Sequence, residues 1–389
     1  MWYQPYIYSI NIRMSATNEN IRTRPVVKLA AIDDQEKFKP LPPPTGTYPY
    51  HLDIKQVLPD LPAHKMVFHM TGDTGGIMLP AFKQRVAAEM VKQYHDAAEP
   101  ADRPSFFFHL GDVVYNYGQA AHYYPQFFEI YEQYPGPIFA IAGNHDADLD
   151  PLDPKSPQSL DAFVHVFCDT KPQAVSFAGN SKRYSNIQPN IYWTLKTPLA
   201  DIICMYSNVP RFGTITPEEK EWFIQELKNA KRSKGEKALI LCIHHAPYSG
   251  DTNHGSSMPM QLFLNAAFEA ADNIPDAVFS GHVHNYQRFN KQYANGKIVP
   301  FIVAGAGGYA DLHKIAPLND FSFPDKNSLL NNVILEKYCD TVHGFLKISI
   351  EKTKEQLVLQ GDYYTIPAVD DVSSTASLFD SFKINLTEK

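Results

Sequence analysis

The sequence predicts a layered α/β domain, and two observations lead to that prediction. Short apolar runs of strand length recur from about Lys65 onward, and each ends in a polar or glycine-rich cluster. Segments whose apolar residues have helical spacing alternate with these runs. Strand–helix alternation is typical of layered α/β domains, in which ligands collect beyond the carboxyl ends of the strands.

The predicted strands are recognised by their length and by the glycine or proline residues that bound them. They are Met66–Met70 before TGDTGG, Phe106–Leu110 before GDVVY, Ile138–Ala142 before GNHD, Ala238–Ile243 before HHAPYSG, Ala277–Phe279 before SGHVH and Phe301–Ala304 before GAGGY.

Two helices are predicted between these strands. Residues 80–94 place Val86 and Met90 on one apolar stripe, and a proline at the start suits a first turn. Thr216 is the expected N-cap of the second helix, because a proline and two acidic residues follow it at the positive end of the helix dipole. This helix is expected to end near Gly235.

Composition limits the classes to which the protein can belong. Its 389 residues are 44% hydrophobic and 20% charged, which is enough for a sizeable core. A net charge of −7 without a long basic run argues against a nucleic-acid-binding surface. The four cysteines are scattered, so a disulfide scaffold is not expected.

The chain shows neither a secretory signal nor an apolar segment of the roughly 20 residues that a membrane helix needs. We therefore expect a cytoplasmic or otherwise soluble protein, with secretion as the alternative if a leader was removed. Residues 1–62 are polar and contain the proline-rich run KPLPPPTGTYPY. They are expected to form an N-terminal extension, and residues 63–389 the catalytic domain.

The polar clusters at the strand ends suggest a metal site. Asp73 and Asp112, each taken alone, are typical of a helix cap or a turn. GNHD at 143–146 is rarer, and in GHVH at 281–284 two histidines one residue apart on extended backbone would point the same way. Carboxylates, an amide oxygen and neutral imidazoles together suit a pair of cations, which one carboxylate can bridge.

Other nucleophiles have no motif in this sequence. G-x-S-x-G is absent, and GAGG at 305–308 lacks the Lys-Ser/Thr ending of a P-loop. A metal pair lowers the pKa of a bound water and neutralises phosphate oxygens. We therefore expect hydrolysis of a small-molecule phosphate ester with metal-bound hydroxide as the nucleophile.

The order GD…GD-x-x-Y…GNH-D…H-x-P…GH-x-H resembles the calcineurin-like metallophosphoesterase superfamily, and more narrowly the purple acid phosphatases. The wider superfamily usually opens with D-x-H, whereas this chain has Gly75 in place of that histidine. Purple acid phosphatases make the same omission and supply a tyrosinate, which Tyr115 matches. The resemblance covers about residues 66–350, in the smaller single-domain form of the family. It implies an αββα sandwich of two mixed β-sheets flanked by helices.

The resemblance also implies roles for individual residues. Ferric iron would be held by Asp73, Tyr115 and His284, and the divalent ion (Fe, Zn or Mn) by Asn144, His245 and His282, with Asp112 bridging. His245 is preferred to His244 because it matches H-x-P, and His244 is interpreted as a supporting or structural residue. His145 and His254 would face the substrate, although His254 is equally well interpreted as a loop histidine without a role.

The ligands alone do not determine the type of ester. Phosphate monoesters are the leading expectation, and phosphodiesters or nucleotides on the same centre are the alternative. A non-catalytic scaffold with this fold is a second alternative. A di-manganese or di-zinc enzyme, with Tyr115 merely packing, is a third. The insert 148–182 matches nothing in the family, so the wall of the substrate pocket is not predicted, and neither is the oligomeric state.

Overall fold

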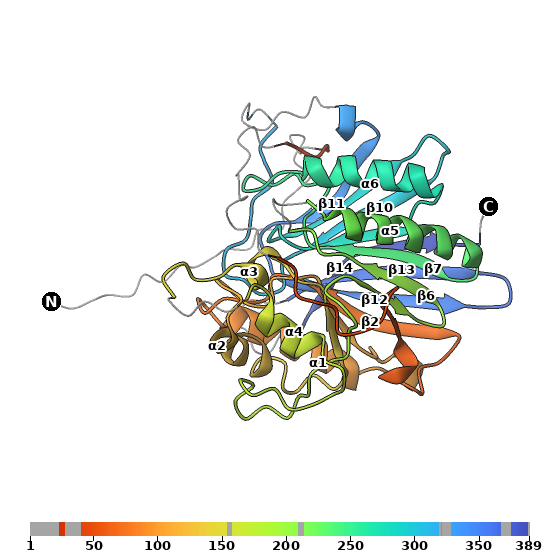
Figure 1. Cartoon of the computed structure of the whole chain (residues 1–389). Coiled ribbons are helices and arrows are strands. Elements are labelled where there is room, and N and C mark those ends of the chain that lie inside the picture. Colours follow the sequence, from red (N-terminus) through yellow and green to blue (C-terminus); the bar gives the residue numbers. More distant parts are fainter. Residues whose placement is uncertain are drawn as a thin grey trace.

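The computed structural model describes residues 23–27, 40–153, 158–208, 214–318, 320, 328–366 and 375–387, and parts of the predicted N-terminal extension, of the 148–182 insert and of the C-terminal tail lie outside these ranges. The described residues form two mixed β-sheets packed face to face with helices on the outside (Figure 1). The predicted αββα sandwich is confirmed.

One sheet has six strands in the order β14-β13-β12-β2-β3-β4. Its strands β2, β3 and β4 run parallel, and β12, β13 and β14 extend it in antiparallel fashion. The bounds are β2 Lys65–Thr71, β3 Phe107–His109, β4 Ile138–Ala140, β12 Gly344–Lys352, β13 Leu357–Thr365 and β14 Ser377–Asn385.

The other sheet has eight strands in the order β1-β5-β6-β7-β8-β10-β9-β11. Its central strands β6, β7, β8 and β10 are parallel, so their carboxyl ends meet at one edge. The bounds are β1 His51–Asp53, β5 Trp193–Lys196, β6 Ala200–Cys204, β7 Ala238–Ile243, β8 Ala277–Ser280, β9 Tyr286–Gln292, β10 Ile298–Ala304 and β11 Val333–Cys339.

Helices lie outside both sheets (Figure 1). Helices α5 and α6 contact each other, and α5 contacts β6 of the eight-stranded sheet, whereas α1 contacts β12 of the six-stranded sheet. The helices are α1 Ala81–His95, α2 Ala120–Tyr123, α3 Asn144–Ala147, α4 Asp161–Phe167, α5 Pro217–Ala230 and α6 Met258–Ala271. Shorter turns are η2 Ile54–Gln56, η3 Pro100–Asp102, the π-helical η4 Tyr124–Phe128, η5 Lys231–Ser233 and η6 Ser328–Leu330.

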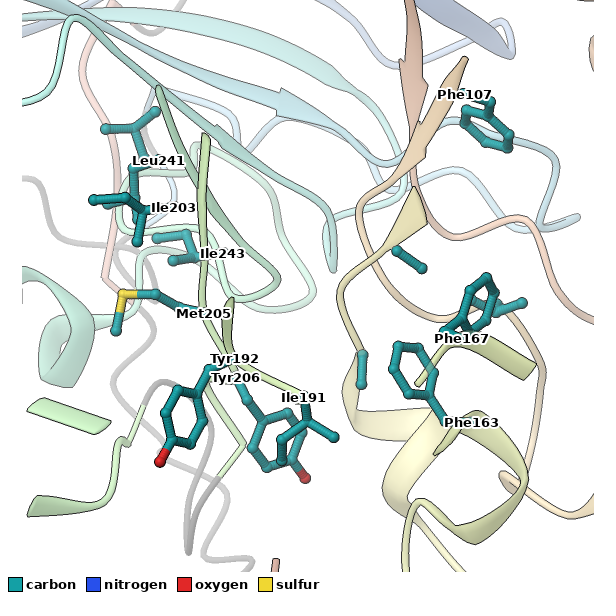
Figure 2. Close-up of a cluster of buried hydrophobic side chains, with 14 of the residues drawn as sticks. Phe107, Phe163, Phe167, Ile191, Tyr192, Ile203, Met205, Tyr206, Leu241 and Ile243 are labelled. Carbon is teal, nitrogen blue, oxygen red and sulfur yellow. The ribbon is translucent and has the colours of Figure 1, made fainter. Parts of the chain in front are cut away.

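Two apolar clusters hold these layers together. The first lies between the sheets and includes Phe68, Phe106 and Trp193. The second joins the outer faces of the strands to the helices, and Figure 2 shows part of it, with Phe163 and Phe167 projecting from α4. Because burial of apolar area is the main favourable contribution to folding, these clusters keep the strand ends in a fixed relation to one another.

The predicted elements match the observed ones closely. Each predicted strand has an observed counterpart, and the predicted helices correspond to α1 and α5. The Thr216 hydroxyl accepts a hydrogen bond from the Glu219 amide at 3.2 Å, which confirms the predicted N-cap. In the part of the chain that the structure describes, no helix is both long and apolar enough to cross a membrane.

The described part of the N-terminal segment packs on the domain. Residues 51–53 form β1 and pair with β5, and the Val26 amide donates to the Ser249 carbonyl at 2.7 Å. The side chain of Val26 is fully buried. These residues therefore lie on the domain as an arm.

Candidate metal centre

The polar residues that follow the parallel strands of both sheets meet in one buried cluster. Asp73 follows β2, Asp112 and Tyr115 follow β3, and Asn144 begins the helix after β4. From the other sheet, His244 and His245 follow β7, and His282 and His284 follow β8. All of these side chains are buried. The strand ends of the two sheets thus form the walls of a single site.

In one half of the cluster, the side chains of Asp73, Asp112 and His284 surround the Tyr115 hydroxyl. It lies 2.7 Å from Oδ2 of Asp112, 3.2 Å from Oδ1 of Asp73 and 2.9 Å from Nε2 of His284. Nε2 of His284 is itself 3.7 Å from Oδ1 of Asp73. Two carboxylates, an imidazole and a phenol therefore face one small volume.

In the other half, the side chains of His244 and His282 approach the side-chain oxygen of Asn144. Its Oδ1 lies 3.0 Å from Nδ1 of His282 and 3.2 Å from Nε2 of His244. That same His244 nitrogen is 3.4 Å from Oδ2 of Asp112. Since Asp112 also contacts Tyr115, its carboxylate lies between the two halves.

Both histidines after β7 reach the cluster. Nδ1 of His244 lies 2.8 Å from the Leu110 carbonyl oxygen. Asp112, His244 and His282 offer ligand atoms within 4.8 Å of one another. His245 places its ring 4.5 Å from that of His282, and its Nδ1 is 2.8 Å from Oγ of Ser207. The choice between His244 and His245 as a ligand stays a prediction.

The GHVH motif does not have the backbone that the sequence suggested. The prediction of two histidines on an extended strand is wrong, because residues 282–285 form a bend between β8 and β9 and His282 has a φ of 68°. Asp73 and Asp112 also have positive φ values, of 58° and 54°. Such backbone costs about 1–3 kcal/mol per residue and collects at functional sites, where the surrounding structure holds it in place.

Glycines allow the backbone to approach these carboxylates. A Cβ on Gly143 would lie 2.1 Å from Oδ1 of Asp112, and one on Gly281 would lie 2.6 Å from Oδ2 of Asp73. No side chain fits at either distance. The glycines of GNHD and GHVH are therefore required by the packing around the two aspartates.

The charges of the cluster suit bound cations. Burial raises the pKa of Asp73 well above its usual value, and the Asp112 charge raises it further against the opposing effect of His244. Burial and the same two carboxylates raise the pKa of Tyr115. Burial also opposes ionisation of Asp112, but the charges of His244 and His145 hold the pKa of Asp112 below its usual value. Positive charge in the cluster therefore favours the ionised acids.

Three of the four imidazoles in the cluster are in the form that binds metals. The exception is His244: burial lowers its pKa, but the charge and hydrogen bond of Asp112 outweigh burial and raise that pKa to about 9. Burial lowers the pKa values of His245, His282 and His284 well below the usual range, and neighbouring histidines lower them further. Neutral imidazole is the ligating form. Carboxylates, an amide oxygen and neutral imidazoles at this density fit a pair of metal ions.

The two predicted substrate-side histidines lie at the edge of the cluster and are only partly buried. The ring of His145 is 4.2 Å from that of Tyr115, and its Nδ1 is 2.9 Å from the Asn116 carbonyl oxygen. The ring of His254 is 4.1 Å from that of His282. One histidine therefore adjoins each half of the cluster.

Several residues that support the cluster were not predicted. Gln126, from η4, is fully buried, and its Oε1 accepts hydrogen bonds from the amides of Gly76 and Tyr115 while its Nε2 donates to the Tyr115 carbonyl. It joins the loop after β2 to the loop after β3. Asp146 accepts hydrogen bonds from the amides of Val113 and Gly143 and so joins the loops after β3 and β4. The GNHD motif signals Asp146, but no motif signals Gln126.

Tyr309 and His313 form the outer wall beside His284. The ring of Tyr309 lies 4.3 Å from that of Tyr115 and 4.6 Å from that of His284, and the ring of His313 lies 4.2 Å from that of His284. Both residues follow GAGG in the sequence. Neither residue was predicted to belong to the site.

Two comparisons with known proteins agree with this architecture. Residues 66–286 match the family model of the calcineurin-like phosphoesterases. The chain also resembles the solved structure of GAP50, described as "the anchor in the inner membrane complex of Plasmodium", with a TM-score of 0.55 and 13% identity over 84% of this chain and 90% of that chain. At that identity, the likeness concerns the fold alone.

Proposed function

Because the chain belongs to the calcineurin-like phosphoesterase family, we propose that it hydrolyses phosphate monoesters at a dinuclear metal centre of the purple acid phosphatase type. The family suggests metal-dependent cleavage of phosphate esters. Membership of the family does not specify the type of ester or the metals. Our proposal for both is based on the residues of the buried cluster.

One observation carries the finer assignment. The Tyr115 hydroxyl lies within hydrogen-bonding distance of Asp112, Asp73 and His284. It is therefore placed to bind the same metal ion as those three side chains. A buried tyrosine that only packed would need one acceptor for its hydroxyl, whereas this hydroxyl faces two carboxylates and an imidazole. This contact supports a tyrosinate ligand in preference to a di-zinc or di-manganese centre in which Tyr115 merely packs.

The proposed ligands divide between two ions. Ferric iron is assigned to Asp73, Tyr115 and His284, the divalent ion (iron, zinc or manganese) to Asn144, His245 and His282, and the bridge to Asp112. We assign His244 to a supporting role, because its Nε2 lies between oxygens of Asp112 and Asn144 and can donate to them. In that role it orients both oxygens.

When bound, two cations lower the pKa of a water molecule and neutralise the oxygens of the phosphate. The protein contributes position and exclusion of water. Asp112 Oδ1 accepts the His145 amide at 2.9 Å, so the bridging carboxylate also fixes the start of the His145 segment. His145 and His254 are assigned to the phosphate oxygens and the leaving oxygen, because they are the partly exposed histidines at the two halves of the buried cluster.

Two other functions remain to be separated by experiment. A phosphodiesterase or nucleotide hydrolase would use the same ligands. A scaffold role is the other alternative, since GAP50 is described as an anchor. Against a scaffold stands the ligand set of this chain. Gly75 replaces the histidine of D-x-H, but each ligand position of the purple acid phosphatase motif carries a metal-binding residue type.

The test is turnover by purified protein of known metal content. We expect hydrolysis of p-nitrophenyl phosphate to exceed that of bis(p-nitrophenyl) phosphate. A preference for the diester would support the phosphodiesterase alternative, and full metal loading without turnover of either ester would support the scaffold.

A further inference from the structure

The loop that carries His254 is built around a buried carboxylate. Asp251 is completely buried, and its Oδ2 accepts hydrogen bonds from the amides of Asn253 at 3.0 Å and His254 at 3.1 Å. Its Oδ1 accepts the Gly255 amide at 2.8 Å and the Ser249 hydroxyl at 2.8 Å. Three consecutive amides at the tip of the loop therefore converge on one side chain.

The two ends of this loop are held by backbone pairing. The Thr252 amide donates to the Lys314 carbonyl at 2.8 Å, and the Ala316 amide donates to the Gly250 carbonyl at 2.7 Å. On the other side, the Ser256 amide donates to the Val26 carbonyl at 2.7 Å. With its ends fixed, the loop depends on Asp251 for the conformation of its tip.

Asp251 also faces the histidine wall of the site. Its Oδ2 is 3.4 Å from Nδ1 of His313, whose ring lies 4.2 Å from that of His284 and 5.0 Å from that of His254. Burial alone would raise the pKa of Asp251, but the hydrogen bond to His313 and the charges of His254 and His313 lower it to about 2. Asp251 is thus ionised at neutral and mildly acidic pH, where both of its oxygens are acceptors.

We propose that Asp251 is a positioning residue, which holds the 251–255 loop so that the His254 ring stays against His282 at the leaving-group side of the centre. The proposal rests on the function proposed above. None of the contacts described above joins Asp251 to a proposed metal ligand, so it acts through His254. Charge-assisted hydrogen bonds from backbone amides are among the stronger ones, which suits a loop that must keep one geometry.

Asp251→Asn gives a sharp test, because it replaces one acceptor oxygen with an amino group that faces backbone donors. A group placed at the leaving oxygen matters most for esters with poor leaving groups. We expect kcat/KM for an alkyl phosphate to fall about 10–100-fold, as for other supporting residues, and that for p-nitrophenyl phosphate to fall less than about threefold. The additional loss should disappear when His254→Ala is already present.

The matched control is Asp380→Asn, which alters another buried carboxylate, paired with Arg288 at 2.7 Å. It should change stability without changing the ratio between the two esters. Equal losses on both esters in Asp251→Asn, or an unchanged loss in the His254→Ala background, would overturn the proposal. If Asp251→Asn does not fold, Ser249→Ala removes one donor to the same carboxylate and should show the same ratio change to a smaller degree.

Hydrogen exchange separates this proposal from the proposed function. The amides of residues 253–255 should exchange at least about tenfold faster in Asp251→Asn than in the wild type, since each donates to the altered side chain. Unchanged exchange would overturn the positioning role whatever the turnover. A metal-loaded wild type that hydrolyses neither ester would defeat the proposed function, and the exchange measurement would still decide on Asp251.

Discussion

The Tyr115 ring packs directly against the backbone of Gly75 and fills the space that a side chain at position 75 would need. A Cβ placed on Gly75 would lie 2.7 Å from Cδ2 of the Tyr115 ring, and equally close to the Val114 backbone. The wider family places a histidine ligand at this position of D-x-H, and no side chain fits there against the Tyr115 ring and the Val114 backbone. The absence of the histidine and the presence of Tyr115 are therefore one structural feature, which supports the tyrosinate assignment.

Gly75→Ala tests this packing. We expect the methyl group to displace Tyr115 or the backbone beside it, because a separation of 2.7 Å is far inside van der Waals contact. Metal affinity should fall about 10–100-fold. Metal content after gel filtration measures the effect. Gly296→Ala, where a Cβ would meet no atom within 4 Å, is a control, although its φ of +84° will cost some stability. Full metal content in Gly75→Ala would contradict the packing argument.

Asp112→Asn should remove most activity. The change withdraws one negative charge from the carboxylate that contacts Tyr115 and lies between the two halves of the cluster. We expect kcat to fall by at least about 100-fold, the upper end of losses seen for residues that only support ligands. Steady-state kinetics and metal analysis check this. If the variant turns over substrate at close to the wild-type rate, the two-metal mechanism is contradicted.

Gln126→Ala should weaken the site from outside the ligand set. It leaves the buried amides of Gly76 and Tyr115 without their acceptor, which costs about 1–3 kcal/mol for each group. Because both amides belong to ligand loops, metal affinity should fall as well. Gln188 is a matched control, since its buried amide bonds the Ala140 backbone at 2.8 and 2.9 Å on β4.

Gln188→Ala should lose stability to a similar extent with a smaller loss of metal. Denaturation by urea and metal titration together separate the two effects. Equal losses of metal affinity in both variants would show that Gln126 has no special part in joining the loops.

His69 should make the protein less stable in acid. Burial lowers its pKa from 6.5 to about 3, so below pH 6.5 the unfolded chain binds a proton that the folded chain does not. Stability therefore falls as the pH drops from 6.5 toward 3, by about 1.4 kcal/mol per pH unit for this group. In His69→Gln the side chain can still bond Tyr134 and Gln93, but it does not titrate.

We expect the difference in unfolding free energy between wild type and His69→Gln to shift in favour of the variant by about 2 kcal/mol between pH 6.5 and 5. Urea denaturation of both proteins at several pH values measures it. A pH-independent difference for His69→Gln would contradict the buried, neutral state of His69.

Much of the fold was predictable because buried parallel strands leave a strong local pattern. The run Ala238–Ile243 coincides with β7, since the fully buried strand is apolar throughout and a polar cluster ends it. The late strands were harder. Strand β14 exposes Leu378 and Phe379, so its sequence lacks the alternation that marks one buried face.

The proposed ligands of the candidate site could be predicted from their residue types, but the residues that hold the ligand loops in place could not. Ligand types at strand ends signalled Asp73, Asp112 and Asn144 directly. Gln126 lies in a π-helical turn, and its partners come from two loops that meet only in the folded protein. The bend at His282 was missed because H-x-H is compatible with a strand, while the approach of Gly281 to Asp73 requires a turn.

The visible spectrum of the iron-loaded, oxidised protein tests the central claim most directly. If Tyr115 binds ferric iron, the resemblance to purple acid phosphatases predicts a charge-transfer band in the visible, and Tyr115→Phe should abolish it while iron remains bound. The variant keeps the ring contacts with His145 and Tyr309 and loses only the hydroxyl. A colourless wild type that is oxidised and replete with iron would contradict the tyrosinate assignment.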